Sequence, residues 1–489
     1  MRNVQVRRGA YVDSVTLMQV SRRVAALDGV SAALVAMATE LNLDLAAGMG
    51  FDLPDTSPNE LLVAVDASSD EVLAEALAEV DAAMAEASRP AARTVVGAGA
   101  LPKPVAAAAR SHATVALIST PGAYAFGDAV DAVDAGLLTM VFSDNVPVEQ
   151  EVTLKEYADR AGVLVMGPDC GTAVVGGVGL GFANVVRPGP VGLVAASGTG
   201  AQHLMSLLDG AGIGISHCLG VGGRDLSAAV GARSTLRALD LLDADEATSL
   251  IVVVSKPPAP EVAEAVRAHA ASLSTPVRFG LLGPGQPDLT ATAASVVEAA
   301  GGTWTAPEHW SGSVSAGRAG GALRGLFAGG TLCDEAMLLA VAALGPVRSN
   351  IPLDPEWALG DDLRSQSHTM VDFGDDRLTQ GRPHPMIDGS LRVDRVRAEV
   401  ADPSTGVLLL DVVLGLGAAD DPAGELAPAV REATSAGVPV VASVVGTRDD
   451  PQGLRSQVAA LNDAGAWVYL SNAEATRCAL GLLAPGGAA

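Results

Sequence analysis

The feature that most constrains the fold is a repeated unit in which an almost continuous apolar strand runs through a turn into a helix. Clear examples are VGLVAASGTGAQHLMSLLDGAG, LIVVVSKPPAPEVAEAV and RGLFAGGTLCDEAMLLA. Strands that are apolar on both faces and separated by helices indicate parallel sheets covered on both sides. We therefore expect an α/β protein whose ligands bind beyond the carboxyl ends of the strands.

The order of these units divides the 489 residues into four expected domains. Residues 1–90 alternate short strands (30–37 and 61–65) with amphipathic helices such as 71–87, which predicts a small ferredoxin-like domain. Residues 91–187 predict a Rossmann-like domain. Residues 188–305 and 320–489 predict two flavodoxin-like domains, joined by a linker rich in Gly, Ser and Ala at 303–323.

Composition excludes several classes of function. A net charge of −25 argues against nucleic-acid binding, which depends on cations that contact phosphates. No apolar run approaches the roughly 18–20 residues that a spanning helix needs, so no membrane partner is expected. The first residues lack the apolar segment of a signal peptide, which indicates the cytoplasm. The four cysteines are far apart, so neither a disulfide framework nor a metal site is expected.

One glycine turn stands out as a candidate anion site. Ser197, Gly198, Thr199 and Gly200 lie between an apolar strand and a helix. Glycines allow close backbone approach, and the free N–H groups of a helix N-terminus attract an anion. The alternative is that Ser197 only caps the helix and the glycines only relieve packing.

Other turns carry weaker signals. Residues 327–331, with Gly329 and Gly330, repeat the pattern of strand, glycines and helix. Residues 411–417, with Gly415 and Gly417, lie before another helix start. Either turn taken alone is better explained by a structural role than by a functional one. Arg224 follows two glycines, and the alternative there is a surface pair with the next residue, an aspartate.

Two further positions are candidates for chemistry. Lys256 follows the strand LIVVVS, where a cation can face a ligand, although an exposed lysine at a strand end is the plainer interpretation. In GRPHPMID, two prolines hold His384 between Arg382 and an aspartate. Such a loop can present a general acid and an anion clamp, or it can be only a rigid connection.

Longer strings resemble the FdrA family. These are MGPDCGTAVVGGVGLGFANVV, VGLVAASGTGAQ, GVGGRDL, SKPPAPEV, LFAGGTLCDEA and GRPHPMID, together with YVDSVTLM near the start. The resemblance covers nearly the whole chain. FdrA proteins belong to the superfamily of succinyl-CoA synthetase and the NDP-forming acyl-CoA ligases. The resemblance implies a CoA-binding-type Rossmann domain followed by two flavodoxin-like ligase domains.

The resemblance also implies a site. In the ligases, helix N-termini from the two flavodoxin-like domains face one another and hold a phosphoryl group. Residues 197–200 match one such turn, and either Gly329 and Gly330 or Gly415 and Gly417 would supply the other. Some family members are implicated in oxamate carbamoyltransferase, in which oxalurate and phosphate give carbamoyl phosphate and oxamate. Companion subunits encoded nearby are required there.

Departures from the ligase pattern qualify this picture. The stretch that matches the phosphohistidine loop, FGLLGPGQPDLTATAASVVEAAGG, has no histidine. Lys256 lies near the position of the carboxylate that supports that histidine, and no ATP-grasp segment is present. These features predict that no phosphohistidine forms. Residues 97–99 match the opening glycine turn of a CoA domain poorly, so the resemblance does not establish CoA binding.

The favoured interpretation is a phosphate-dependent carbamoyl transfer by one subunit of a complex. Phosphate, as a substrate, would bind at the glycine turns. Lys256, Arg382 or Arg224 would bind a small anionic substrate, and His384 would protonate the departing nitrogen. The alternatives are a CoA-dependent acyl ligase subunit without ATP-grasp and a non-catalytic scaffold. We also expect the chain to form an oligomer.

Overall fold

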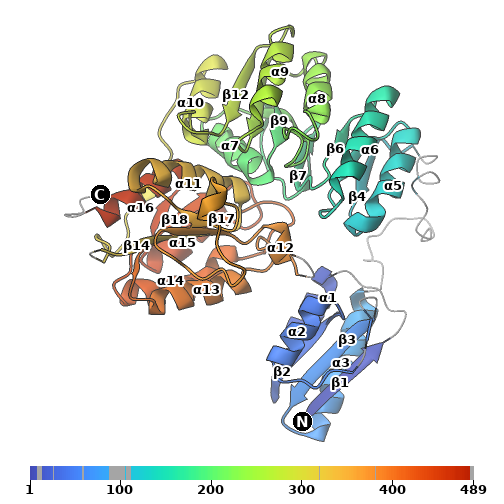
Figure 1. The fold of residues 1–489 in the computed structure, drawn as a ribbon, viewed down its shortest axis with the longest axis vertical. Coiled ribbons are helices and arrows are strands. Elements are labelled where there is room, and N and C mark those ends of the chain that lie inside the picture. Colours follow the sequence, from blue (N-terminus) through green and yellow to red (C-terminus); the bar gives the residue numbers. More distant parts are fainter. Residues whose placement is uncertain are drawn as a thin grey trace. The chain divides into compact units, whose positions relative to one another are not determined.

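The computed structural model describes residues 1–7, 14–25, 27–54, 56–57, 60–87, 105, 112–318, 320–379 and 382–484. The chain forms two compact units (Figure 1). The first comprises residues Met1–Leu101 and Arg377–Pro383. The second comprises Pro102–Asp376 and His384–Ala489. Each unit is described by itself.

The first unit holds a three-stranded antiparallel sheet in the order β1-β3-β2. Its elements are β1 (Arg2–Arg7), α1 (Ser14–Ala25), β2 (Val30–Met37), α2 (Glu40–Gly48), β3 (Leu61–Ala67) and α3 (Asp70–Ala87). Successive side chains of the central strand β3 point to opposite faces. Val63 and Val65 pack with apolar residues of α1 and α3. Leu62 and Ala64 pack on the other face, with apolar residues of α2 and of the segment that follows it. The strands and the helix expected in this region are confirmed.

The second unit begins with a small parallel sheet, β4-β5-β6. It is formed by β4 (Val115–Ile118), β5 (Leu138–Val141) and β6 (Val165–Met166), with helices α5 (Gly122–Asp134) and α6 (Val148–Ala161). Apolar residues of both helices and all three strands share one core.

A six-stranded sheet follows in the order β12-β11-β9-β10-β7-β8. Its parallel strands are β9 (Pro188–Ala196), β10 (Ile215–Gly220), β11 (Leu250–Ser255) and β12 (Val277–Leu281). The helices between and after them are α7 (Gly198–Gly210), α8 (Arg233–Asp243), α9 (Pro260–Ala270) and α10 (Leu289–Ala299). The hairpin β7 (Thr172–Val175) and β8 (Val178–Gly181) joins this sheet through β10, although the sequence places those residues in the Rossmann-like range.

The last sheet has seven strands in the order β13-β19-β18-β17-β14-β16-β15. Its strands are β13 (His309–Trp310), β14 (Ala322–Phe327), β15 (Arg348–Ser349), β16 (Thr369–Asp372), β17 (Thr405–Val413), β18 (Val440–Val445) and β19 (Trp467–Tyr469). The helices are α11 (Gly330–Leu344), η2 (Pro355–Trp357), α13 (Ser390–Ala401), α14 (Pro422–Ser435), α15 (Leu454–Asp463) and α16 (Asn472–Leu483). The short helix α12 (Asp376–Thr379) spans the point where the chain passes from the second unit to the segment Arg377–Pro383 of the first. The expected linker contributes β13, which pairs with β19.

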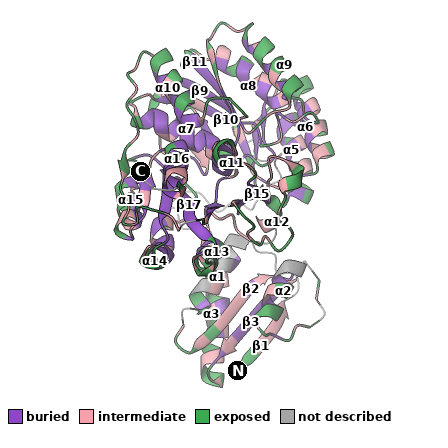
Figure 2. Ribbon diagram, turned by 60° about the vertical axis from the view of Figure 1, so that its left-hand side comes forward, coloured by how far each residue is buried: buried purple, intermediate pink, exposed green. Residues whose placement is uncertain are grey.

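Burial explains why these strands read as continuous apolar runs. Figure 2 shows the strands of the larger sheets buried beneath their helices, and every residue of β11, β14, β17 and β18 is buried. The expected α/β architecture with parallel sheets is confirmed. Among the described residues, no helix is long and apolar enough to cross a membrane.

Candidate functional site

Two glycine turns meet where helices α7 and α11 begin. The hydroxyl oxygens of Ser197 and Thr331 lie 2.6 Å apart and share a hydrogen bond. A Cβ added to Gly329 would lie 2.9 Å from Oγ1 of Thr199, so the two turns touch at a second point. Each turn follows the carboxyl end of a central strand, β9 or β14. The two sheets thus place the N-termini of α7 and α11 next to each other.

The alternative opposing turn has other contacts. The N–H of Gly415 donates to Oε1 of Gln452 at 3.1 Å, and the N–H of Leu416 donates to the carbonyl of Ala183 at 2.8 Å. Gly415 and Gly417 both have positive φ angles, 128° and 77°, which favour glycine. Of the two candidates from the sequence, it is therefore Gly329 and Gly330 that face the start of α7.

The backbone donors of the two turns divide into bound and open groups. The N–H of Gly200 donates to Oγ of Ser197 at 2.9 Å, and the N–H of Gly329 donates to Asp411 at 2.8 Å. In the described part of the chain, four other N–H groups of the two turns have no protein acceptor. They belong to Gly198, Thr199, Gly330 and Thr331. Open donors at helix starts are the groups that bind phosphate-like anions.

Lys256 lies beside the second turn. A Cβ added to Gly330 would lie 3.0 Å from Nζ of Lys256 and 2.6 Å from Oδ2 of Asp372. Burial lowers the pKa of Lys256, but the carboxylates of Asp334, Asp372 and Asp169 outweigh it and raise that pKa overall. The lysine is half-buried rather than exposed at its strand end. It therefore brings a positive charge to the turns.

Carboxyl groups around this lysine were not identified from the sequence. Burial raises the pKa of Asp372 to about 7 and that of Asp334 to about 6, while Lys256 opposes both shifts. Desolvation also raises the pKa of Asp169 to about 7. Asp372 ends strand β16 and Asp169 follows strand β6, so the signal that could have revealed them is an acidic residue at the carboxyl end of a parallel strand.

His384 lies on the other side of Asp372. A Cβ added to Gly374 would lie 2.8 Å from Nε2 of His384 and 3.2 Å from Oδ1 of Asp372. Burial, with a smaller effect from Arg392, lowers the pKa of His384 to about 4. The N–H of Met386 donates to Nδ1 at 3.3 Å, which places the proton of the neutral ring on Nε2. At neutral pH the ring is thus a hydrogen-bond donor rather than a charged acid.

The two predicted arginines have other surroundings. Arg224 donates to Oε2 of Glu151 at 3.0 Å and to the carbonyl of Val146 at 2.8 Å. Glu151 is buried and also pairs with Lys155, so Arg224 belongs to a structural ion network; its partner is not the neighbouring Asp225. Arg382 lies in the segment that groups with the first unit, where its N–H donates to the carbonyl of Thr379 at 3.0 Å.

Metal ligands are not grouped at any described position. No cluster of three or more His, Cys, Asp or Glu residues in the described ranges could hold a metal ion. All four cysteines are buried free thiols. The glycine turn expected at residues 97–99 lies outside the described residues.

Comparison with known proteins decides the family. Residues 326–482 match the family described as CoA-ligase, and residues 1–99 match "AllF, heavy metal-associated domain". The uncharacterized protein YahF of Escherichia coli is 36% identical over 506 aligned residues, which cover 94% of this chain and 95% of YahF. This chain belongs to the YahF family. Its family relations place it in the CoA-ligase superfamily, with an N-terminal domain of the AllF type.

More distant relatives of this YahF-family chain are ligases. The malate–CoA ligase subunit alpha of Methylorubrum extorquens is 28% identical over 173 residues, which cover 34% of this chain and 57% of that subunit. A solved dinucleotide-forming acetyl-coenzyme A synthetase 1 of Ca. Korarchaeum cryptofilum, in complex with phosphate and ADP, matches 81% of this chain and 90% of its own. The sequence identity there is 18% and the TM-score 0.32.

These findings correct the enzyme class expected from the sequence. A carbamoyltransferase was expected, but the matched domain and the named ligase relatives belong to the CoA-ligase class. The transferase assignment is wrong, because it came from a role of some FdrA proteins and not from a feature of the site. The glycine turns on which it was built fit ligase chemistry as well.

The AllF-type domain has a further peculiarity. It is described as heavy metal-associated, yet residues 1–99 contain neither cysteine nor histidine. Soft metal ions bind thiolate and imidazole ligands. The sequence of this domain therefore offers neither thiolate nor imidazole ligands to such ions.

Proposed function

We propose that this chain is the subunit of a CoA-ligase-type enzyme that holds the phosphate group of an acyl phosphate. The observation that carries the proposal is the meeting of the two glycine turns, joined by the hydrogen bond of 2.6 Å between Ser197 and Thr331. Four open N–H groups and the ammonium of Lys256 surround this point. Membership of the CoA-ligase superfamily supports the same chemistry.

Different residues of the site would serve different parts of the proposed reaction. In this reaction class an acyl phosphate and a thiol give a thioester and free phosphate: the bond from acyl carbon to phosphate oxygen breaks, a bond to sulfur forms, and the thiol proton passes to phosphate. The backbone N–H groups and Lys256 stabilise the negative charge that develops on the departing phosphate. The Nε2–H of His384, beside Asp372, can donate to an acyl oxygen.

The site supports direct use of an acyl phosphate without a phosphohistidine. His384 has its Nδ1 engaged by Met386, and His203 is fully buried, with its pKa lowered to about 4 by that burial. Neither is placed as a free nucleophile between the turns. Incubation with ³²P-labelled acetyl phosphate should leave the chain unlabelled, and acid-labile label on a histidine would contradict this part of the proposal.

Phosphate binding tests the proposal directly. Equilibrium dialysis with labelled phosphate should show saturable binding to the wild-type protein. Lys256→Met should weaken it by about 1.5–3 kcal/mol, the usual contribution of a hydrogen bond to a charged group. Gly330→Ala should weaken it as well, because the added methyl group would meet Asp372 and Lys256 within 3.0 Å.

The matched control is Arg431→Met, which removes an exposed cation on helix α14. It should bind phosphate like the wild type. Equal binding by the wild type and Lys256→Met, with intact melting curves, would overturn the proposed role of the turns. Absence of phosphate binding in every form would favour a non-catalytic scaffold instead. Companion subunits should be copurified for assays of thioester formation.

A further inference from the structure

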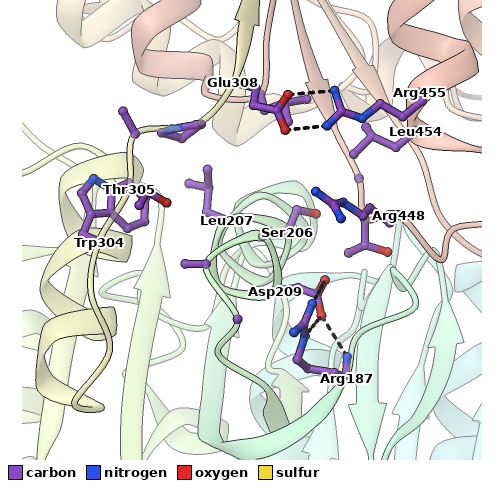
Figure 3. Close-up of a pocket in the computed structure, with 18 residues that line it drawn as sticks. Arg187, Ser206, Leu207, Asp209, Trp304, Thr305, Glu308, Arg448, Leu454 and Arg455 are labelled. Carbon is purple, nitrogen blue, oxygen red and sulfur yellow. Dashed lines mark hydrogen bonds and ion pairs between the residues drawn. The ribbon is translucent and has the colours of Figure 1, made fainter.

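A cavity lies at the carboxyl end of helix α7, away from the glycine turns. Its volume is about 340 Å³, which is within the range of small-molecule sites. Helix α7 lines it with Ser206, Leu207, Asp209 and Gly210, whereas the glycine turn lies at the first residues of that helix. Most of the remaining wall comes from the connection at 304–308, from residues 446–448 after β18 and from residues 454–455 at the start of helix α15 (Figure 3). The cavity is therefore separate from the candidate phosphate site.

Two ion pairs balance most of the charged side chains that line this cavity, and one arginine lies outside these pairs. Arg187 pairs with Asp209 at 2.9 Å, and Arg455 pairs with both oxygens of Glu308, at 2.8 and 2.5 Å. Arg448 makes no hydrogen bond or ion pair to any described residue. It contributes only at a distance, after Arg455, to the lowered pKa of Glu308. An arginine with no hydrogen-bonded partner at a cavity wall is suited to a carboxylate, whose geometry matches the guanidinium group.

The backbone adds donors on the same side. Helix α15 begins in the cavity wall, and no side chain in the described part of the chain caps its N-terminus. The loop before it is held firmly, because Asp450 accepts the N–H groups of Thr447 and Val185, both at 2.7 Å. Val185 precedes β9 and Thr447 follows β18, so the loop is tied to the six-stranded and to the seven-stranded sheet. Arg448 is thus presented from a fixed backbone.

The opposite wall is apolar. Figure 3 shows Trp304 and Arg448 on opposite sides of the cavity, with Leu207 and Ser206 of α7 between them. Leu470 and, on the side of Arg448, Leu454 add further apolar lining. An indole ring and leucine side chains favour contact with a flat apolar group, while the arginine favours a charged one.

We propose that this cavity binds a small planar aromatic monoanion, an aromatic carboxylate. The ring lies between Trp304 and Leu207, and the carboxylate meets Arg448 and the start of helix α15. This site does not depend on the proposed ligase function. Because its walls come from both larger sheets, a bound ligand bridges the two halves of the second unit and should raise its melting temperature.

Calorimetry with benzoate as the probe tests this site on the full-length protein. The wild type should bind benzoate saturably, and Arg448→Met should bind it at least about tenfold more weakly, as expected for a lost charge-assisted contact. Trp304→Leu should also weaken binding. The matched control Arg431→Met should bind like the wild type, and neutral benzamide should bind more weakly than benzoate.

Competition separates this site from the glycine turns. Saturating inorganic phosphate should leave the benzoate affinity unchanged. Displacement of benzoate by phosphate would place benzoate at the turns and overturn the proposal. So would a failure of benzoate to saturate below about 10 mM, or equal binding by wild type and Arg448→Met. Arg448 is exposed, so its substitution should leave the melting curve of the free protein unchanged.

Discussion

The two glycine turns look alike in sequence but are stabilised in different ways. At the start of α7, Ser197 accepts the N–H of Gly200 from within the same turn. At the start of α11 no side chain of the turn caps the helix. There the N–H groups of Ala328 and Gly329 donate to Asp411, at 2.7 and 2.8 Å, from the neighbouring strand β17.

The two turns also differ in whether charged side chains stabilise them. Asp411 is fully buried and pairs with Arg392 at 3.0 Å, so the second turn rests on an ion pair inside the core. The first turn uses only a neutral hydroxyl group. A turn capped by its own serine should fold locally, whereas the second turn needs β17 and α13 in place first. We therefore expect substitutions at the second turn to have the larger effects.

The largest effect should come from Asp411→Ala. Removal of this carboxylate leaves Arg392 buried without its counter-charge and frees two backbone donors in the core. Breaking a buried pair in this way costs about 3–5 kcal/mol of unfolding free energy. Urea denaturation measures it. The matched control, Asp394→Ala on the exposed face of α13, should change the unfolding free energy by less than about 0.5 kcal/mol. Similar losses in the two variants would remove the claimed contrast between the turns.

The next effect depends on pH and concerns Asp372, beside the second turn. Its pKa rises from 3.8 to about 7 in the folded protein. The contribution of such a carboxyl group to stability is fully present below its pKa in the unfolded chain. It is lost as the pH rises through its higher pKa in the folded protein. The asparagine in Asp372→Asn does not titrate. The unfolding free energy of this variant should therefore rise relative to that of the wild type between about pH 4 and pH 7, by up to about 4 kcal/mol.

Urea denaturation of both proteins at several pH values measures this gain. Asp463→Asn, at an exposed position of α15, is the matched control and should follow the wild type. A difference between Asp372→Asn and the wild type that stays constant from pH 4 to pH 8 would show that Asp372 does not titrate as described.

A smaller effect is expected at the first turn. Ser197→Ala removes the cap of α7 and the hydroxyl partner of Thr331. Loss of a serine cap costs about 1 kcal/mol of unfolding free energy. Ser197→Asp keeps a cap, so it should recover stability while it repels phosphate from the turns. If Ser197→Ala proves as destabilising as Asp411→Ala, the first turn does not fold as locally as we argue.

The smallest effect is the coupling between the turns. A double-mutant cycle of Ser197→Ala and Thr331→Val measures the hydrogen bond of 2.6 Å between them. We expect a coupling of about 0.5–1 kcal/mol. Strictly additive effects would mean that the two hydroxyl groups lie together without stabilising each other. The turns would then be held only by the sheets behind them.

Much of this architecture was predictable because it is encoded locally. Buried parallel strands must be apolar on both faces, and they must pass through turns into helices, so their runs identify β9, β11, β14 and β17 in the sequence alone. Ser197 was predictable as a cap for the same reason, since it acts on a residue three positions away. Lys256 and His384 were recognisable as polar residues at strand ends or in rigid loops.

The enzyme class illustrates the opposite case. Neither the turns nor Lys256 specify whether the group transferred is an acyl or a carbamoyl group, because both reactions need the same donors around a phosphate. Residue types alone therefore could not correct the carbamoyl assignment; the family relations did. The hairpin β7–β8 was assigned to the preceding domain, because strand pairing with β10 depends on contacts distant in sequence.

The sequence by itself determined the strands, the turns and the first helix cap, since each depends on residues within a few positions of one another. Only the tertiary structure decided which turn faces α7, because the candidates at 329–330 and 415–417 have equivalent glycines. It also decided the surroundings of Lys256. This lysine is between 78 and 116 residues along the chain from Asp169, Asp334 and Asp372, and it meets them only because separate strand and helix ends come together. Charges so far apart along the chain interact only after the sheets that carry them have packed.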